Sequence, residues 1–583
     1  MISQKDLVAI DYIVFKSGAD QKFRTALKSD TRGRHASSDQ SLFIAGMLMA
    51  VRIYNKAHIS KIHHALTEDL PMQWQFDWKV RQTRRDAQGK PYVWTIGIND
   101  LQNISRSVLD RMNYSEKRLP DQIEPGDMAE ERTRRYEMLI DLVDTLLIAS
   151  LIPRPEGACD YALDGTGMWA NERYAKTLPK AETLVKGDED AELALGEEHA
   201  GAHSEGVETL EQVETPCVDE AVKTRKKGGL SDAAFGGKTS KGWKTEMYFG
   251  YEMHALVRAP EVTEPGKMRP EPPLAERIRL TPASTDVVNV SLELIDSVVS
   301  TGQKIRNLMS DRHYSFKQFD RWFRELLLRD INQVVDLRVD DQGFKEWNGV
   351  LIAAGQPHCT ATPVHLGTIC RPEKGASEAD WKKFSQLISE REAYSTSMPS
   401  PLNADGSFRV GCPALAGTIG CPLRPGTVPA ARQLGLPIVI NPPASDEAPT
   451  ICKQDSVGFK ITQPKHASMM KVHQKTYWGS LKHLILNNRR TYVEGWFGMF
   501  KGDSSACKKR GSSMYIGLAH AHLEAVAFAV VANLIALRSW DKETGLGDPN
   551  HPFFQEVVQS YGYIRLSEQE YQDYALAREN PAA

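Results

Sequence analysis

The sequence is poor in cysteine and carries no strong excess of charge of either sign. Eight cysteines in 583 residues are too few for a disulfide scaffold, so a reducing compartment is expected. The formal net charge of −3 does not by itself suggest a DNA-binding protein. Hydrophobic residues make up 41% and charged residues 25%, which is ordinary for a soluble globular protein. The length allows several domains.

A long apolar run is also missing. The most apolar late segment, AVAFAVVANLIAL at 525–537, is about 13 residues long and contains Asn533. A helix that crosses a bilayer needs roughly 20 apolar residues, so this segment predicts a buried helix. The first residues, MISQKDLVAIDYIVF, lack the basic start and the apolar core of a signal peptide. These absences predict a cytoplasmic protein with no membrane partner.

The charges are distributed unevenly along the chain. Residues 1–120 contain 19 Lys and Arg against 12 Asp and Glu, a surplus of +7. Residues 182–220 contain 13 acidic residues and one Lys. The acidic segment therefore masks a basic remainder, and basic surface is what a nucleic-acid backbone requires.

The most informative motif is RRTYVEGWFGMFKG at 489–502. Arg490, Glu494 and Lys501 stand at offsets 0, +4 and +11, which places them on one face of a helix. A carboxylate between two cations can hold a divalent metal beside DNA phosphates, while the cations contact the phosphates. The alternative is an ordinary surface pair of Arg490 and Glu494, which stabilises a helix by a few tenths of a kcal/mol.

Two aspartates upstream follow apolar runs that predict strands. Asp164 stands in YALDGTG and Asp311 stands in LMSDRHY. Alone, each is more often a turn or cap residue, and Asp160 is a rival to Asp164, although DGT after an apolar run fits a strand end better. Together with Glu494, two aspartates at strand ends and a glutamate on a helix predict metal-dependent phosphoryl transfer on nucleic acid.

These segments resemble the DDE transposases of bacterial insertion sequences, in the group with a Tyr–Arg–Glu–Lys signature. Arg490, Glu494 and Lys501 match the spacing of that signature, whereas Asn487 stands where the family has Tyr. LDGTGMWA and SDRHYSFKQF resemble the two aspartate motifs. GYEMHALV at 250–257 resembles the family's middle strand, with His254 near its end.

The resemblance implies a fold, a reaction and partners. It implies an α/β protein with a ribonuclease-H-like mixed sheet, an inserted subdomain, and a helical N-terminal DNA-binding region. Asp164, Asp311 and Glu494 would be catalytic and would hold two Mg²⁺ or Mn²⁺ ions, while Arg490, Lys501 and His254 would contact DNA. The expected reaction is cleavage at transposon ends followed by attack of the freed 3′-hydroxyl on target DNA.

The partners implied are double-stranded DNA, as terminal inverted repeats and target, and a second copy of the chain in a synaptic homodimer. The expected location is the cytoplasm, in association with the nucleoid. Two other functions stay open. One is a domesticated or inactive relative that only binds DNA, for which Asn487 is the local hint. The other is a ribonuclease-H-like nuclease that cleaves without strand transfer.

Composition and motifs divide the chain into four parts. Residues 1–150 are predicted to be a helical DNA-binding region. Residues 151–341 form the first part of the catalytic domain, with an acidic, flexible insertion at 176–230. Residues 342–480 are predicted to be an inserted subdomain rich in Cys, Pro and Gly. Residues 481–583 complete the catalytic domain with the helix of the glutamate and further helices.

Several local structures are predicted within these parts. The apolar pattern at 40–54 predicts a helix, and Ser60 is a plausible cap of the next one. The basic segment at 79–90 predicts a loop that, with short helices, is compatible with either helix-turn-helix DNA reading or a plain helical bundle. CDYALD predicts a strand that ends at Asp164, and Ser315 is expected to cap the helix SFKQFDRWFRELLLRD.

The inserted subdomain also raises the question of zinc. It contains five of the eight cysteines: Cys359, Cys370, Cys412, Cys421 and Cys452. Cysteine is a usual zinc ligand, but the spacings do not form a CxxC knuckle. A zinc site and isolated buried or loop cysteines both remain open, with the latter favoured.

Overall fold

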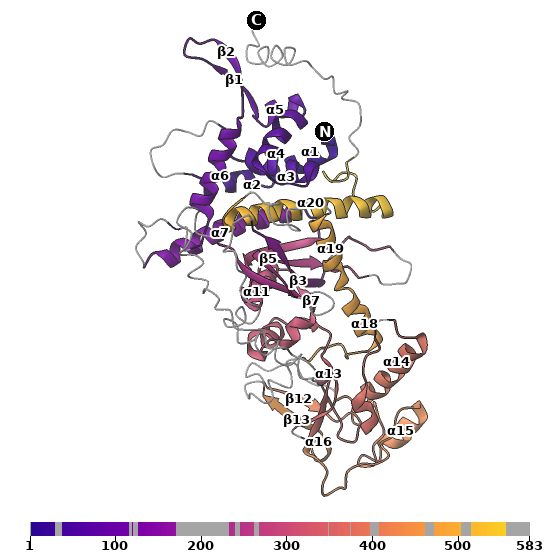
Figure 1. Ribbon diagram of the computed structural model, residues 1–583. Helices are drawn as coiled ribbons and strands as arrows, with labels where there is room; N and C mark the ends of the chain where they lie inside the picture. The colour runs from indigo at the N-terminus through magenta and orange to yellow at the C-terminus, as the bar shows by residue number, and fades with distance from the viewer. Residues whose placement is uncertain are drawn as a thin grey trace, which may run out of the picture.

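A computed structural model gives the fold (Figure 1). It describes most of the chain outside the acidic segment and the C-terminal stretch. The predicted flexible insertion at 176–230 lies outside the described residues. The residues described are 2–28, 38–115, 119, 126–154, 156–170, 232–239, 245–261, 268–347, 349–373, 375–396, 407–460, 472–502 and 515–555.

The N-terminal region is mostly helical, as predicted. The apolar pattern at 40–54 forms α3 (Leu42–Tyr54), which is buried over most of its length. The cap predicted at Ser60 is wrong, because α4 (Ile59–His64) begins directly after His58, whose backbone is extended. The other helices here are α1 (Gln4–Asp11), η1 (Tyr12–Lys16), α2 (Ala19–Ala26), η2 (Ala65–Asp69), α5 (Met72–Asp77), α6 (Ile98–Met112) and α7 (Met128–Ile148).

The basic segment predicted as a loop is instead part of a β-hairpin. Strand β1 (Arg81–Arg85) pairs antiparallel with β2 (Pro91–Thr95). The turn closes because the Asp86 carboxylate accepts hydrogen bonds from the backbone N–H groups of Gln88 and Lys90, at 3.0 and 2.8 Å. Gly89 supplies the positive φ of +79° that such a turn favours.

The centre of the protein is a six-stranded mixed sheet in a mixed α/β fold. Its long strand β5 (Thr245–Arg258) pairs antiparallel with β3 (Cys159–Trp169) on one side. On the other side β5 pairs antiparallel with β4 (Ala234–Thr239) and then with β6 (Ala275–Pro282). Beyond β3, the strands β7 (Ile305–Ser310) and β8 (Asn332–Val334) follow in parallel.

Helices cover both faces of this sheet (Figure 1). Alternate side chains of a strand point to opposite faces. Ala162 and Met168 of β3 belong to the core that α19 (Thr491–Lys501) and α20 (Leu518–Thr544) complete. Tyr161 and Leu163 belong to a second core with α11 (Val287–Val299).

Two predicted boundaries near the aspartates are wrong. Strand β3 does not end at Asp164 but continues to Trp169, because β5 pairs with it along this whole stretch. The helix predicted after Asp311 is broken into a 3-10 turn η4 (Arg312–Phe316), a π turn η5 (Phe319–Phe323) and α12 (Arg324–Leu328). Ser315 lies inside η4, where its hydroxyl donates to the Arg312 carbonyl at 2.7 Å.

The segment at 525–537 is part of the 27-residue helix α20, much longer than its apolar run. By length and composition α20 could cross a membrane, but 94% of its apolar window is buried inside the protein. Asn533 lies in this core, where its side chain bonds the backbone of Ala275 and the indole of Trp496. The segment is therefore part of a buried core helix, as predicted.

The chain between β8 and α18 (Leu481–Asn488) builds a separate lobe with its own core. In Figure 1 this lobe lies below the central sheet. Its core is formed by small strands and short helices together with the α14 helix. Its elements are α13 (Val339–Gln342), β9 (Lys345–Trp347), β10 (Val350–Ala353), β11 (Gln356–His358), η6 (Val364–Thr368), α14 (Glu378–Ala393), β12 (Ser407–Gly411), α15 (Thr427–Leu434), α16 (Thr450–Lys453) and β13 (Ser456–Lys460).

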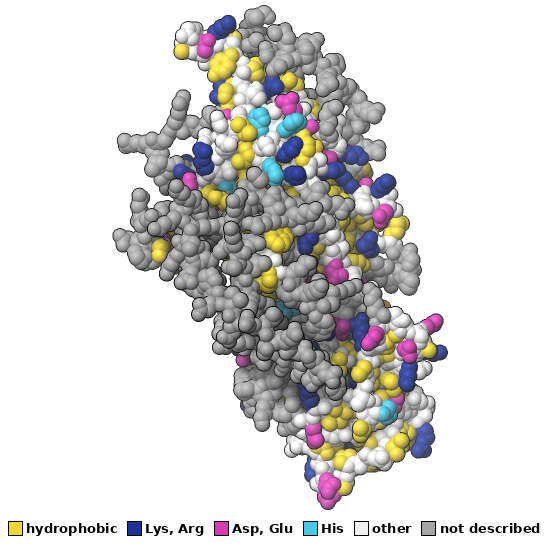
Figure 2. All heavy atoms as spheres, viewed as in Figure 1, with side chains coloured by type: hydrophobic (Ala, Val, Ile, Leu, Met, Phe, Trp, Pro, Cys, Tyr) yellow, Lys and Arg dark blue, Asp and Glu magenta, His cyan; other side chains and the backbone are white. Residues whose placement is uncertain are grey.

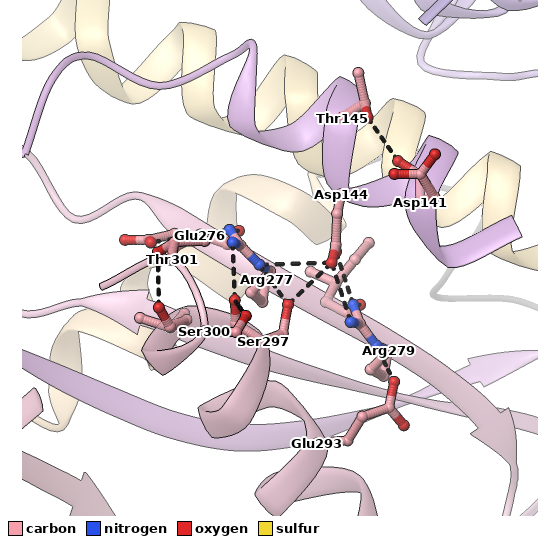
Figure 3. A network of polar contacts seen from close by, with 12 residues as sticks. Asp141, Asp144, Thr145, Glu276, Arg277, Arg279, Glu293, Ser297, Ser300 and Thr301 are labelled. Carbon is pink, nitrogen blue, oxygen red and sulfur yellow. Dashed lines mark hydrogen bonds and ion pairs between the residues drawn. The ribbon is translucent and has the colours of Figure 1, made fainter. Parts of the chain in front are cut away.

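A polar network joins the N-terminal helices to the sheet (Figure 3). Arg279 of β6 donates to both carboxylate oxygens of Asp144 on α7, at 2.8 and 3.1 Å, and to Glu293 of α11 at 2.5 Å. Arg277, two residues earlier, donates to the Ser297 hydroxyl at 2.8 Å, and this hydroxyl donates to Asp144 at 3.0 Å. Both arginine side chains are almost fully buried. The network therefore ties α7 to the edge of the sheet.

Candidate active site

Parallel pairing brings the two predicted aspartates side by side. The last register pair of β3 with β7 is Leu163 with Ser310. Asp164 and Asp311 are the next residues on these two strands, although only β3 continues as a strand beyond this point. Asp311 is exposed and begins the η4 turn, with its carboxylate accepting from the Arg312 N–H at 2.6 Å.

Helix α19 brings the third predicted residue to the same face of the sheet. The helix packs on β3 and β5 through a buried apolar side that includes Val493, Trp496 and Phe500. Glu494 stands on its other side, with 48% of its side chain exposed. Asp164 points to the α19 side because it alternates with Leu163, which belongs to the opposite core.

The electrostatics of Asp164 show that these groups are neighbours. Its pKa is raised to about 6, mainly by burial, and the negative charges of Asp311 and Glu494 raise it further. The Gly165 N–H, which donates to Asp164 at 2.8 Å, and the positive charge of Arg490 lower it. The structure thus gathers Asp164, Asp311, Glu494 and Arg490 into one cluster, called here the carboxylate cluster.

The cations of the signature flank Glu494. Arg490 donates from Nη2 to Glu494 Oε1 at 2.7 Å, so the predicted pair exists. Arg490 is the residue before the first turn of α19, and Lys501 is its last residue. The helix ends at Gly502, whose φ is +29°. Contact of Arg490 and Lys501 with DNA stays a prediction.

His254 occupies a different environment from the one expected. It pairs with Gly165 across β3 and β5, so it lies on the sheet face opposite Asp164. It is fully buried, burial lowers its pKa to about 4, and neither ring nitrogen has a hydrogen-bond partner among the described residues. A side chain buried to this extent cannot reach DNA without a rearrangement, which argues against the prediction that His254 contacts DNA.

A buried carboxylate that sequence reasoning missed lies beside His254. Glu252 faces Gly167 two positions along β5, and burial raises its pKa. A Cβ added to Gly165 would lie 2.9 Å from Glu252 Oε1 and 3.1 Å from His254 Nδ1. A side chain at position 165 would therefore require Glu252 and His254 to shift.

Asp160, the alternative to Asp164, is held by hydrogen bonds from other segments of the protein. It accepts from Arg306 at 2.8 and 2.7 Å, from Asn307 at 2.8 Å and from Arg489 at 2.7 Å. Burial raises its pKa, but the bonds from Arg306 and the charge of Arg489 outweigh burial and lower it. With all these donors bound, Asp160 anchors the protein and is not available as a ligand.

The donor set suits a hard divalent cation, but it is not assembled in this structure. Three carboxylates are the oxygen ligands that Mg²⁺ and Mn²⁺ prefer. Among the residues that the structure describes, no three His, Cys, Asp or Glu side chains are placed to hold a metal ion together. Glu494 bonds Arg490 instead, so it would have to leave that partner to join Asp164 and Asp311 at a metal.

Most of the cysteines of the lower lobe are withdrawn from solvent. Cys359, Cys412 and Cys421 are buried in the lobe, and Cys452 packs on its core. Burial raises the pKa of Cys359 to about 12 and that of Cys452 to about 11, and the neighbouring cysteines add to both shifts. The described part of the chain contains no group of three or more ligands placed to hold zinc.

No family model, curated protein or solved structure matches this chain. Fold and site define it as a mixed α/β protein with acidic side chains gathered where β3, β7 and the helix α19 come together. Anything more specific rests on the residues of that cluster.

Proposed function

We propose that this protein is a DDE transposase with a ribonuclease-H-like core, which cleaves transposon ends and joins the freed 3′-hydroxyl to target DNA. The observation that carries the proposal is that Asp164 and Asp311 follow paired positions on β3 and β7, and that α19 brings Glu494 within electrostatic range of Asp164. An accidental cluster of three carboxylates is disfavoured, because their mutual repulsion costs free energy unless a cation offsets it.

The sheet supports the ribonuclease-H-like part of the proposal. β3 has an antiparallel neighbour on one side and a parallel neighbour on the other, and both aspartates follow the paired stretch of the parallel strands. The lower lobe lies between β8 and α18, in the interval where the resemblance implies an inserted subdomain. The α19 helix returns to the sheet after that lobe and supplies Glu494.

Each residue of the cluster has a task in this chemistry. Asp164, Asp311 and Glu494 would hold two Mg²⁺ or Mn²⁺ ions, which supply Lewis-acid activation of the attacking oxygen and stabilise the leaving oxygen. Asp164 must lose its proton before it can act as a ligand, and its raised pKa makes that loss depend on pH. Arg490, released from Glu494, would hold a DNA phosphate through its planar guanidinium, with Lys501 as a second cation.

The proposal extends to partners and location. The substrate is double-stranded DNA, as terminal inverted repeats and as target, and a homodimer would hold two ends together. A cytoplasmic location agrees with the burial of α20. A homodimer and nucleoid association remain proposals drawn from the resemblance.

The test is cleavage and joining of the DNA that flanks the gene. A supercoiled plasmid carrying both flanks is incubated with the protein and Mg²⁺ or Mn²⁺, with and without a second plasmid as target. Asp164→Asn, Asp311→Asn and Glu494→Gln should each lower cleavage by several orders of magnitude while DNA binding persists. Asp340→Asn, on the short helix α13 of the lower lobe, is the matched control and should cleave normally.

The same assay separates the other functions. Cleavage without joined products would identify a nuclease that lacks strand transfer. Binding without cleavage would identify a DNA-binding relative, which the replacement of the family's Tyr by Asn487 would then explain. Near-normal cleavage by Glu494→Gln would overturn the assignment of the helix-borne ligand.

A further inference from the structure

The hairpin of β1 and β2 stands apart from every other strand. It forms a two-stranded sheet of its own and projects from the helical N-terminal region (Figure 1). No residue from Arg81 to Thr95 is buried. A two-stranded hairpin is at best marginally stable in water, and Trp94 packs this one against the main core. The tip at 85–92 is exposed throughout and is accessible for contact with something outside the chain.

The hairpin is strongly basic. Residues 79–90 contain five cations, Lys79, Arg81, Arg84, Arg85 and Lys90, against the single acidic residue Asp86, which gives a net charge of +4. Asp86 already accepts two backbone hydrogen bonds in the turn. Figure 2 shows Lys and Arg side chains at the tip of this projection. Such a density of positive charge on a thin, exposed element attracts a polyanion.

The two faces of the ribbon combine cations with flat side chains. Cross-strand pairing puts Arg84 beside Tyr92, and Trp94 lies on the same face. The Arg84 guanidinium stacks over the Trp94 ring at 3.7 Å from its centroid, while Tyr92 is 46% exposed. Arg85 lies on the opposite face, across from Pro91. Each face thus presents an arginine, and the indole restrains one of them before any ligand binds.

The dimensions suit a groove of duplex DNA. Each strand has five residues, which gives a ribbon about 17 Å long. The major groove of B-DNA is about 12 Å wide and admits a two-stranded β-ribbon. We propose that the β1–β2 hairpin enters a groove of double-stranded DNA, where Arg84, Arg85 and Lys90 contact phosphates and base edges. This inference rests on the proposed function, since it names the element that holds the DNA substrate.

The experiment measures binding of the full chain to a fluorescent 40-base-pair duplex of random sequence, without divalent metal, at several salt concentrations. The variant Arg84→Ala/Arg85→Ala/Lys90→Ala should bind about tenfold more weakly or worse at 0.1 M salt. The slope of log K against log salt should become shallower by up to about 2.7, because each lost phosphate contact removes about 0.9. Arg84→Lys keeps the charge and should keep the slope.

The control is Lys382→Ala/Lys383→Ala, on the exposed side of α14 in the lower lobe. It should bind DNA like the unaltered protein. Thermal unfolding should be the same for all variants, because none of these side chains is buried. An unchanged slope in the hairpin variant, or no DNA binding by the unaltered protein, would overturn the inference. The binding assay measures no cleavage, so its outcome is separate from that of the cleavage test. If the protein fails to cleave but binds DNA through the hairpin, the hairpin inference holds and only the transposase proposal is refuted.

Discussion

Arg489 donates to Asp160 at 2.7 Å, joining positions 329 residues apart in the sequence. The Asp160 side chain is fully buried and that of Arg489 is 8% exposed. Arg489 also bonds the Ala259 carbonyl at the end of β5. The pair fixes the beginning of α19 to β3, four residues before Asp164 and five before Glu494 on their respective elements. It therefore sets the distance between the two carboxylate-bearing elements.

Breaking this pair should disturb both stability and catalysis. Asp160→Asn should lower the free energy of unfolding by about 3–5 kcal/mol, because it leaves the buried Arg489 charge unpaired. Arg489→Met should cost less, because Asp160 keeps its bonds from Arg306 and Asn307. The double variant should lose less than the sum. Cleavage should stay slow at a temperature where the variants are fully folded, while DNA binding stays normal. Recovery of the full cleavage rate under those conditions would show that Arg489 only stabilises the fold.

Metal binding should depend on pH around the pKa of Asp164. The pKa of about 6 is above the ordinary 3.8, so the folded protein binds the proton more tightly than the unfolded chain. That contribution to stability is present below pH 3.8 and is lost as pH rises through about 6. Mn²⁺ affinity, measured by calorimetry, should rise from pH 5 to pH 7 with proton release. A flat affinity across this range would contradict the shift.

Asp164→Asn should stabilise the metal-free protein at pH 7.5. The ionised carboxylate is disfavoured there by burial and by its two acidic neighbours, and the amide removes that charge. An increase of about 1 kcal/mol or more in the free energy of unfolding is expected, since one unit of pKa shift corresponds to about 1.4 kcal/mol. Denaturation in excess EDTA measures it, and the difference should vanish near pH 4.

Arg490 should act on both the cluster and the DNA. Because its charge lowers the pKa of Asp164, Arg490→Ala should move the acid limb of the cleavage–pH profile to higher pH. It should also make the salt dependence of DNA binding shallower, and Arg490→Lys should not restore full activity because the planar fork is lost. Lys482→Ala, on the exposed side of the adjacent α18, is the control. If the pH dependence of cleavage were unchanged in Arg490→Ala, the Arg490–Glu494 contact would be only a surface ion pair.

The network of Figure 3 predicts that two aspartates of α7, Asp144 and Asp141, contribute very differently to the free energy of unfolding. Asp144→Ala should lower the free energy of unfolding by about 3–5 kcal/mol, because Arg277 and Arg279 stay buried without their shared carboxylate. Asp141→Ala, one turn earlier, removes a carboxylate that is 61% exposed and pairs only with Lys22 in the described structure. That change should cost less than about 1 kcal/mol. Equal losses would show that the network is not the link between α7 and the sheet.

Local patterns in the sequence were enough for many elements. The apolar run of α3, the strand β5 and the position of Asp311 after β7 all appear where the sequence predicts them. In each, the side chains that face the core recur at the period of the element itself. Gly502 ends α19 for an equally local reason, since its backbone adopts a positive φ.

Only the tertiary structure decided which residues meet. Asp160 and Asp164 look alike in sequence, yet three donors from distant segments engage one, while acidic neighbours surround the other. His254 and Asp164 lie on opposite faces because of a strand register that depends on both strands. The basic segment at 79–90 became a hairpin because a later segment pairs with it. The sequence by itself determined the chemistry available and the local elements. The long-range pairing of those elements decided where each charge lies, because burial and neighbouring charge are properties of the packed molecule.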